Sequence, residues 1–360
     1  MHRAMIDAMP EPSGPPPRVA RRRVLTAAGG LVGTMALAGC GIRLEHDAPD
    51  LPLIPRQPIP AEDALVALTL ECAALAEQAA AAGSTPLLTA LAGLHARQHD
   101  VLVTALSAKG VPSTALAPPT PSTTSAGTAT PSGTPSTSPS SGVSPSPGAT
   151  PATPAGPTPQ ALAALAAAEA AALDRRAALV AAEPDLRPSV CAVLAQRYAA
   201  SALLGGRPPS PTPDRTSGAG TAGGWAVPAD AVPLLTATRS AAYALEVVAA
   251  QSSTTQRRRA LTALRTLSDL LAEQAATLGD TTPEPPLGYQ LPFPVTTPAE
   301  ADRLATLVLT RLRGAYGATL GPLTDTAAAA AFERLPWWLG RVEVLAHGWD
   351  APLQAFAGLS

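Results

Sequence analysis

The stretch TPAEADRLATLVLTRLRGAYGATL, Thr297–Leu320, carries the clearest structural signal in the chain. Thr297 stands before Pro298, and Glu300 follows three residues after the threonine. This is the pattern of a helix N-cap with a first-turn proline and a capping box. Apolar residues then recur three and four positions apart, on or near one helical face: Leu304, Leu307, Val308, Leu312, Ala315 and Leu320. We therefore predict an amphipathic helix here.

Segments of the same kind recur along the chain, in two halves with the same layout. The predicted helices are 61–82, 86–108, 159–182 and 186–204 in the first half, and 229–251, 255–278, 298–320 and 324–346 in the second. A short turn makes neighbours antiparallel, whereas the long connection in each half lets the third helix start at the far end of the second. That is the single-crossover topology of ferritin-like four-helix bundles. We expect an all-α fold with two such bundles in tandem, produced by internal duplication.

Composition agrees with helices and excludes one class of partner. Hydrophobic residues make up 46% of the chain but aromatic residues only 3%, so the interior must be filled largely by Ala, Leu and Val. A formal net charge of −2 gives no electrostatic footprint for nucleic acid. We expect no nucleic-acid partner.

The N-terminus reads as an export signal. Arg21–Leu25 resembles the twin-arginine motif, and the apolar run Val24–Ala38 that follows is too short to span a bilayer as a helix. The sequence Leu37–Cys40 resembles a bacterial lipobox, in which Cys40 would take a diacylglycerol. We expect an extracytoplasmic protein that is anchored to the outer face of the cell membrane through Cys40.

Low-complexity stretches set the expected domain boundaries. Residues Gly110–Pro159 contain no charged residue and are almost wholly Pro, Ser, Thr, Gly and Ala, which predicts disorder. The expected organisation is a signal peptide at 1–39, a tether at 40–60, a first bundle at 61–204 with a disordered insert at 110–158, a linker at 205–227 and a second bundle at 228–360.

The C-terminal half resembles a known family. The crossover segment Leu287–Pro298, the following helix with Tyr316, the terminal helix with Trp337 and Trp338, and the closing Gln354–Leu359 are similar to the ferritin-like domain of unknown function found in exported actinobacterial proteins. The resemblance covers roughly Pro228 to Ser360, and the first half matches only in layout. It implies a bundle fold and supplies no activity.

Two cysteines remain after Cys40 is assigned to the lipid. Cys72 and Cys191 are an even pair in a compartment where disulfides persist. Nothing in the sequence places them within bonding distance. A disulfide between them and two separately buried thiols both stay open.

The ferritin-like layout invites a test for a di-metal site. Such sites need inward Glu residues on two helices and a Glu-x-x-His on each of the other two, and the chain contains no Glu-x-x-His. Helical phase nevertheless directs His95, Gln98 and Glu169 inward, with Glu71 and His99 on the flanks. One interpretation takes Glu71, His95, His99 and Glu169 as a reduced site for iron, manganese or zinc. The favoured interpretation is a structural polar cluster in which Arg176 or Arg197 pairs with Glu169 and Gln98 bonds His95.

The second half offers fewer polar candidates. Glu246 could pair with Arg265 on the next helix, and Glu343 and His347 lie one turn apart, which favours a side-chain pair over a shared cation. Trp337 and Trp338 are expected to pack in the bundle.

The expected function follows from these patterns. We expect a lipid-anchored binding or scaffolding module with a protein or cell-envelope partner, no cofactor and no intrinsic catalysis. The alternative is a metal-binding or redox protein with a degenerate site in the first bundle.

Overall fold

A computed structural model describes residues 56–118, 156–209 and 228–359 of the chain. Within these ranges the secondary structure is helical and contains no strand, which confirms the all-α fold. The predicted signal peptide, Cys40, and most of the predicted tether, insert and linker lie outside the described residues.

The first half consists of one hairpin and a second, less regular pair of helices. Its main helices are α1 (Glu62–Ala82), α2 (Pro86–Ala108), α4 (Pro159–Ala171) and α6 (Arg187–Leu203). The predicted helix 159–182 is interrupted after α4 by a 3-10 turn (Ala172–Arg175) and resumes as the short α5 (Arg176–Leu179). The tighter turn changes the helical phase, so that Leu173 and Leu179 are both fully buried.

The second half repeats this order of neighbours. It consists of α7 (Val232–Gln251), α8 (Thr254–Leu278), α9 (Pro298–Thr326) and α10 (Ala328–Gly348), preceded by a 3-10 turn at Pro228–Ala231 and with another at Gly279–Thr281. The first helix contacts the second and third, and the third contacts the fourth, in both halves. Gln256, near the start of α8, donates to the carbonyl of Pro298 at the start of α9. The two helices therefore begin at the same end, as a crossover connection requires.

Three helices start in the same way, with a threonine N-cap followed by proline. The Thr85 side chain accepts from Leu88 N at the start of α2, and Thr158 accepts from Ala161 N at the start of α4. At the start of α9, Thr297 and Glu300 form the complete capping box that the sequence predicts. Because each threonine satisfies an amide that the helix leaves unpaired, these boundaries are fixed locally.

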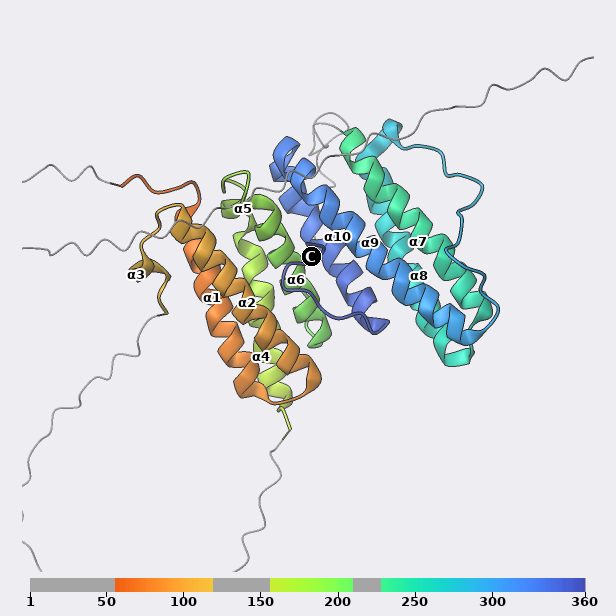
Figure 1. Ribbon diagram of the computed structural model, residues 1–360, viewed down its shortest axis with the longest axis horizontal. Coiled ribbons are helices and arrows are strands. Elements are labelled where there is room, and N and C mark those ends of the chain that lie inside the picture. The colour runs from red at the N-terminus through yellow and green to blue at the C-terminus, as the bar shows by residue number, and fades with distance from the viewer. Residues whose placement is uncertain (1–55, 119–155, 210–227, 360) are drawn as a thin grey trace, which may run out of the picture. The chain divides into compact units, whose positions relative to one another are not determined.

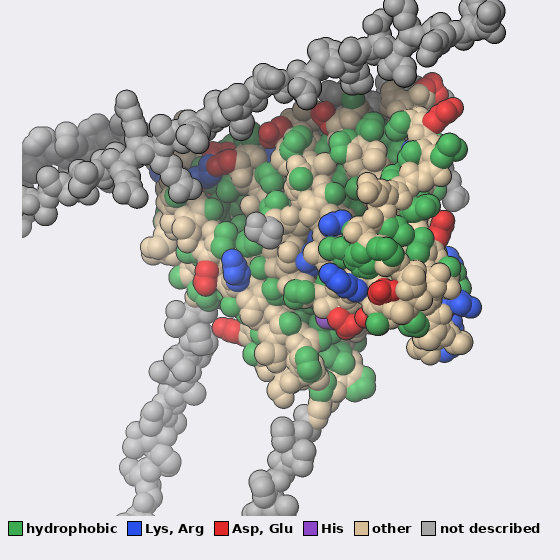
Figure 2. Space-filling view, turned by 45° about the vertical axis from the view of Figure 1, so that its right-hand side comes forward, with side chains coloured by type: hydrophobic (Ala, Val, Ile, Leu, Met, Phe, Trp, Pro, Cys, Tyr) green, Lys and Arg blue, Asp and Glu red, His purple; other side chains and the backbone are tan. Residues whose placement is uncertain are grey.

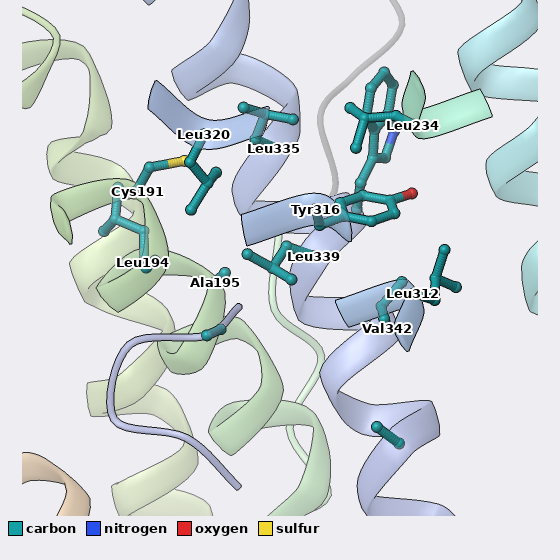
Figure 3. Close-up of a cluster of buried hydrophobic side chains, with 14 of the residues drawn as sticks. Cys191, Leu194, Ala195, Leu234, Leu312, Tyr316, Leu320, Leu335, Leu339 and Val342 are labelled. Atoms are coloured by element: carbon teal, nitrogen blue, oxygen red, sulfur yellow. The ribbon is translucent and has the colours of Figure 1, made fainter. Parts of the chain in front are cut away.

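The two halves share one core. The described residues belong to one compact unit, Arg56–Ser360, in which α6 packs along α10 and also touches α9 (Figure 1). Figure 3 shows Cys191 and Leu194 of α6 facing Leu320 of α9 and Leu335 and Leu339 of α10. All five side chains are 0% exposed. The fourth helices of the two halves thus join the described residues into one packed body.

The start of the predicted disordered insert is part of this core. The helix α3 (Ser113–Leu116) follows α2, and both Val111 and Leu116 are 3% exposed. These are two of the few apolar residues in a tract of small and polar ones. The prediction that the insert begins at residue 110 was therefore wrong, because two apolar side chains bury enough surface to hold this segment against α1 and α2.

Candidate functional site

A group of polar side chains is buried between the helices of the first half. We call it the first cluster. Each member is fully buried, and together they come from α1, α2, α4 and α6: Cys72, His95, Gln98, Glu169, Gln196 and Arg197.

Arg197 is the centre of this cluster. Its Nη1 lies 3.1 Å from Glu169 Oε2 and 3.0 Å from His95 Nδ1, and its Nη2 lies 3.0 Å from Cys72 Sγ. His95 Nε2 lies 2.6 Å from Glu169 Oε1. His95 Nε2 is the donor to the Glu169 carboxylate, because a carboxylate can only accept. His95 Nδ1 lies between Arg197 Nη1, which can only donate, and Gln98 Oε1 at 3.1 Å, which can only accept.

The charges of the cluster hold Glu169 ionised. Burial alone disfavours the carboxylate, but Arg197 and His95 together outweigh this effect, and the pKa of Glu169 lies below its ordinary value. For Cys72 the balance is the opposite. Burial raises the pKa of its thiol more than Arg197 lowers it, so the protonated thiol is the stable form.

A second buried ion pair lies in the other half. Arg313 of α9 is 3% exposed and Glu343 of α10 is 0% exposed, and Arg313 Nη1 lies 3.2 Å from Glu343 Oε2. Here burial outweighs the nearby arginine and the bond from the amide of Gln354, so the pKa of Glu343 lies above its ordinary value. We call these two residues the second pair.

The C-terminal tail, residues 349–359, touches both groups. Gln98 Nε2 of the first cluster donates to the carbonyl oxygen of Ala355. The amide of Gln354 donates to Glu343 Oε1 over 2.8 Å, and Arg313 donates to the carbonyl of Pro352 over 2.8 Å. The tail therefore links the polar interior of one half to that of the other (Figure 1).

The structure separates the four residues proposed for a metal site. His95 and Glu169 meet, but Glu71 pairs with Arg175 near the surface and His99 contacts the exposed Asp100. No group of three His, Cys, Asp or Glu side chains in the described ranges is arranged to hold a metal ion. The polar-cluster interpretation matches the observed contacts, with Arg197 rather than Arg176 as the partner of Glu169.

Of three further predictions, two are wrong and one is confirmed. Glu246 does not pair with Arg265, because both side chains are exposed and Arg265 bonds Thr262 instead. The hydrogen-bonding partner of Glu343 is Arg313 and not His347, whose Nδ1 is buried with no hydrogen-bond partner among the described residues. Trp337 and Trp338 are each 1% exposed, so the prediction that they pack in the bundle is confirmed.

The suggested disulfide is not formed. Cys72 and Cys191 are both free and buried. Cys72 lies against Arg197 in the first cluster, whereas Cys191 points into the core shared by α6, α9 and α10 (Figure 3). Both thiols belong to one hydrophobic core, but their immediate neighbours differ.

The sequence analysis did not predict that Arg313 belongs to a buried ion pair or that Gln196 belongs to the first cluster. A signal for Arg313 exists, because it stands four residues after Leu309 and three before Tyr316, on the buried face of α9. An arginine on such a stripe indicates a buried acidic partner on a neighbouring helix. No local pattern marks Gln196, since nearly every residue around it in α6 is buried.

The chemistry open to the first cluster is limited by its own contacts. Glu169, His95 and Arg197 hydrogen-bond one another, and none of them is exposed. A cation at Glu169 and His95 would also face the guanidinium of Arg197, which repels it. The donor set therefore suits a structural network better than a metal centre.

One described helix has the length and composition to cross a membrane. This helix is α1, but its residues Leu65, Leu68 and Leu75 are buried in the core, against neighbours that include α2 and α4. Length and composition are weak evidence for a membrane span, because the core helix of a folded domain passes the same test.

Comparison with known proteins assigns one region. Residues 232–360, which span α7 to the C-terminus, match the family described as Domain of unknown function (DUF4439). Neither the curated proteins nor the solved structures contain a match. The C-terminal half of the chain thus contains a DUF4439 domain, and the first half lies outside the matched residues.

Proposed function

We propose that the protein is a lipid-anchored, extracytoplasmic module that binds or scaffolds a partner in the cell envelope and performs no catalysis itself. The observation that carries this proposal is the state of the buried ionisable groups. In each half a buried glutamate is paired with a buried arginine and closed off from solvent, and the C-terminal tail contacts both groups. A catalytic acid, base or nucleophile needs access to substrate, and these groups have none.

The anchor is argued from the sequence. A diacylglyceryl group on Cys40 supplies two hydrocarbon chains, and two chains hold a protein stably where one gives marginal attachment. Residues 40–60 would then space the first helix from the membrane. Helix α1 begins at Glu62, so the folded body starts directly after this tether.

A scaffold must hold its shape under load, and the packing supports this role. The two halves share a core through α6 and α10, and the tail is bonded to both. The outer faces of such a body keep fixed positions relative to one another. We place the partner-binding surface on those outer faces.

The test is membrane fractionation of the full chain and of Cys40→Ser. We expect the unchanged chain in the membrane fraction and Cys40→Ser in the soluble extracytoplasmic fraction. Cys191→Ser is the matched control, because it also removes one thiol but leaves the anchor. Attachment that survives Cys40→Ser, or recovery of the unchanged chain from the cytoplasm, would contradict the proposal.

The metal-binding alternative has its own test. Elemental analysis of the protein purified from its native host should find no stoichiometric iron, manganese or zinc. Stoichiometric metal that disappears in both His95→Gln and Glu169→Gln would replace our proposal with the alternative. Arg175→Gln, which frees the surface carboxylate of Glu71, is the control and should leave the metal content unchanged.

A further inference from the structure

The crossover between α8 and α9 runs along the outer edge of the second half (Figure 1). Its residues Thr282–Gly288, which we call the proline stretch, include Pro283, Pro285 and Pro286. A proline fixes its own φ at about −65°, and a residue before a proline is confined to extended conformations. One or both of these effects act on every residue from 282 to 286. They favour the polyproline II conformation, and Thr282 has φ −64° and ψ 115°.

The proline stretch is an exposed apolar segment. Residues 282–286 form no helix, strand or turn, and Pro285, Pro286 and Gly288 are exposed. Leu287 is 110% exposed, more than any other large hydrophobic side chain in the described ranges. Figure 2 turns this side of the molecule forward and shows hydrophobic side chains at the surface. Because proline has no amide hydrogen, the stretch presents rings and carbonyl groups with few backbone donors.

Contacts with α7 hold the proline stretch at both of its ends. Arg239 of α7 donates to the carbonyl of Pro283 over 2.7 Å. Directly after the stretch, the ring of Tyr289 contacts that of Tyr243, with 5.8 Å between their centroids. Leu287 lies between these two contacts. A segment that is ordered before its partner arrives loses less entropy on binding.

These features fit one kind of partner. Proteins that bind polyproline II segments do so with grooves lined by aromatic side chains, and the segment needs little further ordering. We propose that the proline stretch docks into such a groove on a partner protein. Pro285, Pro286 and Leu287 fill the groove, and Glu284 lies at its rim. This inference rests on the proposed function, because it names the segment that binds the partner and the chemistry of the partner's surface.

A membrane surface fits the proline stretch less well. Glu284 is the only charged residue of the stretch, and it stands among the prolines. Anionic lipid headgroups attract basic side chains and repel a carboxylate. A basic side chain at the rim of a protein groove would instead pair with Glu284.

The test is photo-crosslinking of the full chain in the envelope fraction of its native host. Leu287→p-benzoylphenylalanine places the photoreactive group in the proline stretch. Leu261→p-benzoylphenylalanine is the matched control, at an exposed leucine of α8. From position 287 we expect a protein adduct whose peptide map places the crosslink beside Trp, Tyr or Phe. An excess of the synthetic peptide of residues 282–290 should abolish this adduct, and the same peptide with alanine in place of its three prolines should not.

Second substitutions in the chain that carries the probe at position 287 measure which residues matter. Pro285→Ala with Pro286→Ala should lower the adduct yield about fivefold or more. Glu284→Gln should lower it about twofold, since this carboxylate is exposed. Pro86→Ala, which removes an exposed proline at the start of α2, should leave the yield unchanged.

Three results would overturn the proposal. Position 287 could give no protein adduct, it could give a lipid adduct instead, or its protein adduct could be insensitive to the proline peptide and to the proline substitutions. Fractionation of the same samples separates these failures from a failure of the proposed function. A chain that is attached to the membrane and gives protein adducts from position 261 but none from 287 still binds a partner, through another face.

Discussion

Both halves of the molecule bury an ion pair, but the residues and the surroundings of the pair differ. In each, an arginine and a glutamate are buried between the third and the fourth helix, but the residues have exchanged places. In the first half Glu169 lies on the third helix and Arg197 on the fourth, whereas in the second Arg313 lies on the third and Glu343 on the fourth. The pKa of Glu169 is lowered and that of Glu343 is raised.

The difference lies in how many groups surround each carboxylate. Glu169 has contacts with both Arg197 and His95, and Arg197 reaches further to Cys72. Glu343 has one nitrogen of Arg313 and one amide of the tail. A buried carboxylate is compensated only when enough hydrogen-bond donors face it. The first cluster therefore compensates the charge of Glu169, whereas the second pair compensates that of Glu343 only in part.

The largest effect should come from removing the arginines. Arg197→Met leaves Glu169 buried without its cation and should lower the free energy of unfolding by about 3–5 kcal/mol. Arg313→Met should cost about half as much, because the pKa of Glu343 is already raised and the carboxyl can take up a proton instead. Urea denaturation at pH 7 measures both. Equal losses would show that the two sites do not differ in the way we infer.

The next effect concerns the tail that joins the halves. Gly317 of α9 touches Gly358, and a Cβ at Gly317 would lie 1.8 Å from the carbonyl oxygen of Gly358. Gly317→Ala should therefore displace the tail, lower stability by about 2–3 kcal/mol and speed hydrogen exchange at the amide of Gln354. The matched control is Gly314→Ala on the same helix, where a Cβ meets nothing within 4 Å.

Gly314→Ala should raise stability by about 0.5–1 kcal/mol, because alanine is the better helix former and the site has room for it. Unchanged exchange at Gln354 in Gly317→Ala would contradict the role given to the tail. Such a result would mean that the second pair is shielded from solvent without the tail.

Local signals predicted the helices and part of the first cluster. The Thr-Pro starts at residues 85, 158 and 297 all form caps, because an N-cap depends only on the next three residues. Helical phase directed His95, Gln98 and Glu169 inward, and all three are buried. Helical phase placed Glu71 and His99 at the edges of the buried face. In the structure Glu71 pairs with Arg175 and His99 contacts Asp100, both near the surface.

The rest depends on contacts between distant segments. No local pattern states that α6 packs on α10, or that a tail without periodicity lies across both polar groups. The surroundings of Cys72 and Cys191 have the same origin, because Cys72 contacts Arg197 of another helix and Cys191 faces Leu320 of α9. Spacing along the sequence carries none of this information.

Removing the two negative charges should have opposite effects that depend on pH. Because the pKa of Glu169 is lowered, its contribution to stability is present above about pH 4.3 and is lost as pH falls through its folded pKa. Glu169→Gln should thus cost about 1–3 kcal/mol at pH 7 and progressively less below pH 4. The pKa of Glu343 is raised, so its contribution is present below about pH 4.3 and is lost as pH rises through its folded pKa.

Glu343→Gln should therefore be close to neutral in acid and no less stable than the unchanged chain at pH 7. Thermal unfolding from pH 3 to pH 7 follows both variants against the same reference. If the two difference curves bend in the same direction, the comparison between the halves is wrong.

The smallest effect distinguishes the polar interior from the apolar one. Cys72 accepts from Arg197 and lies near Gln98 Oε1, and a serine hydroxyl can make both contacts, so Cys72→Ser should change stability by less than about 1 kcal/mol. Cys191 lies among leucines and has no such partner among the described residues, so Cys191→Ser should cost about 1–3 kcal/mol for the buried hydroxyl. Urea denaturation of the two variants measures the difference. A larger loss of stability in Cys72→Ser than in Cys191→Ser would mean that packing, and not hydrogen bonding, holds the thiol of Cys72. The polar network around Arg197 would then be smaller than the one that distinguishes the first half from the second.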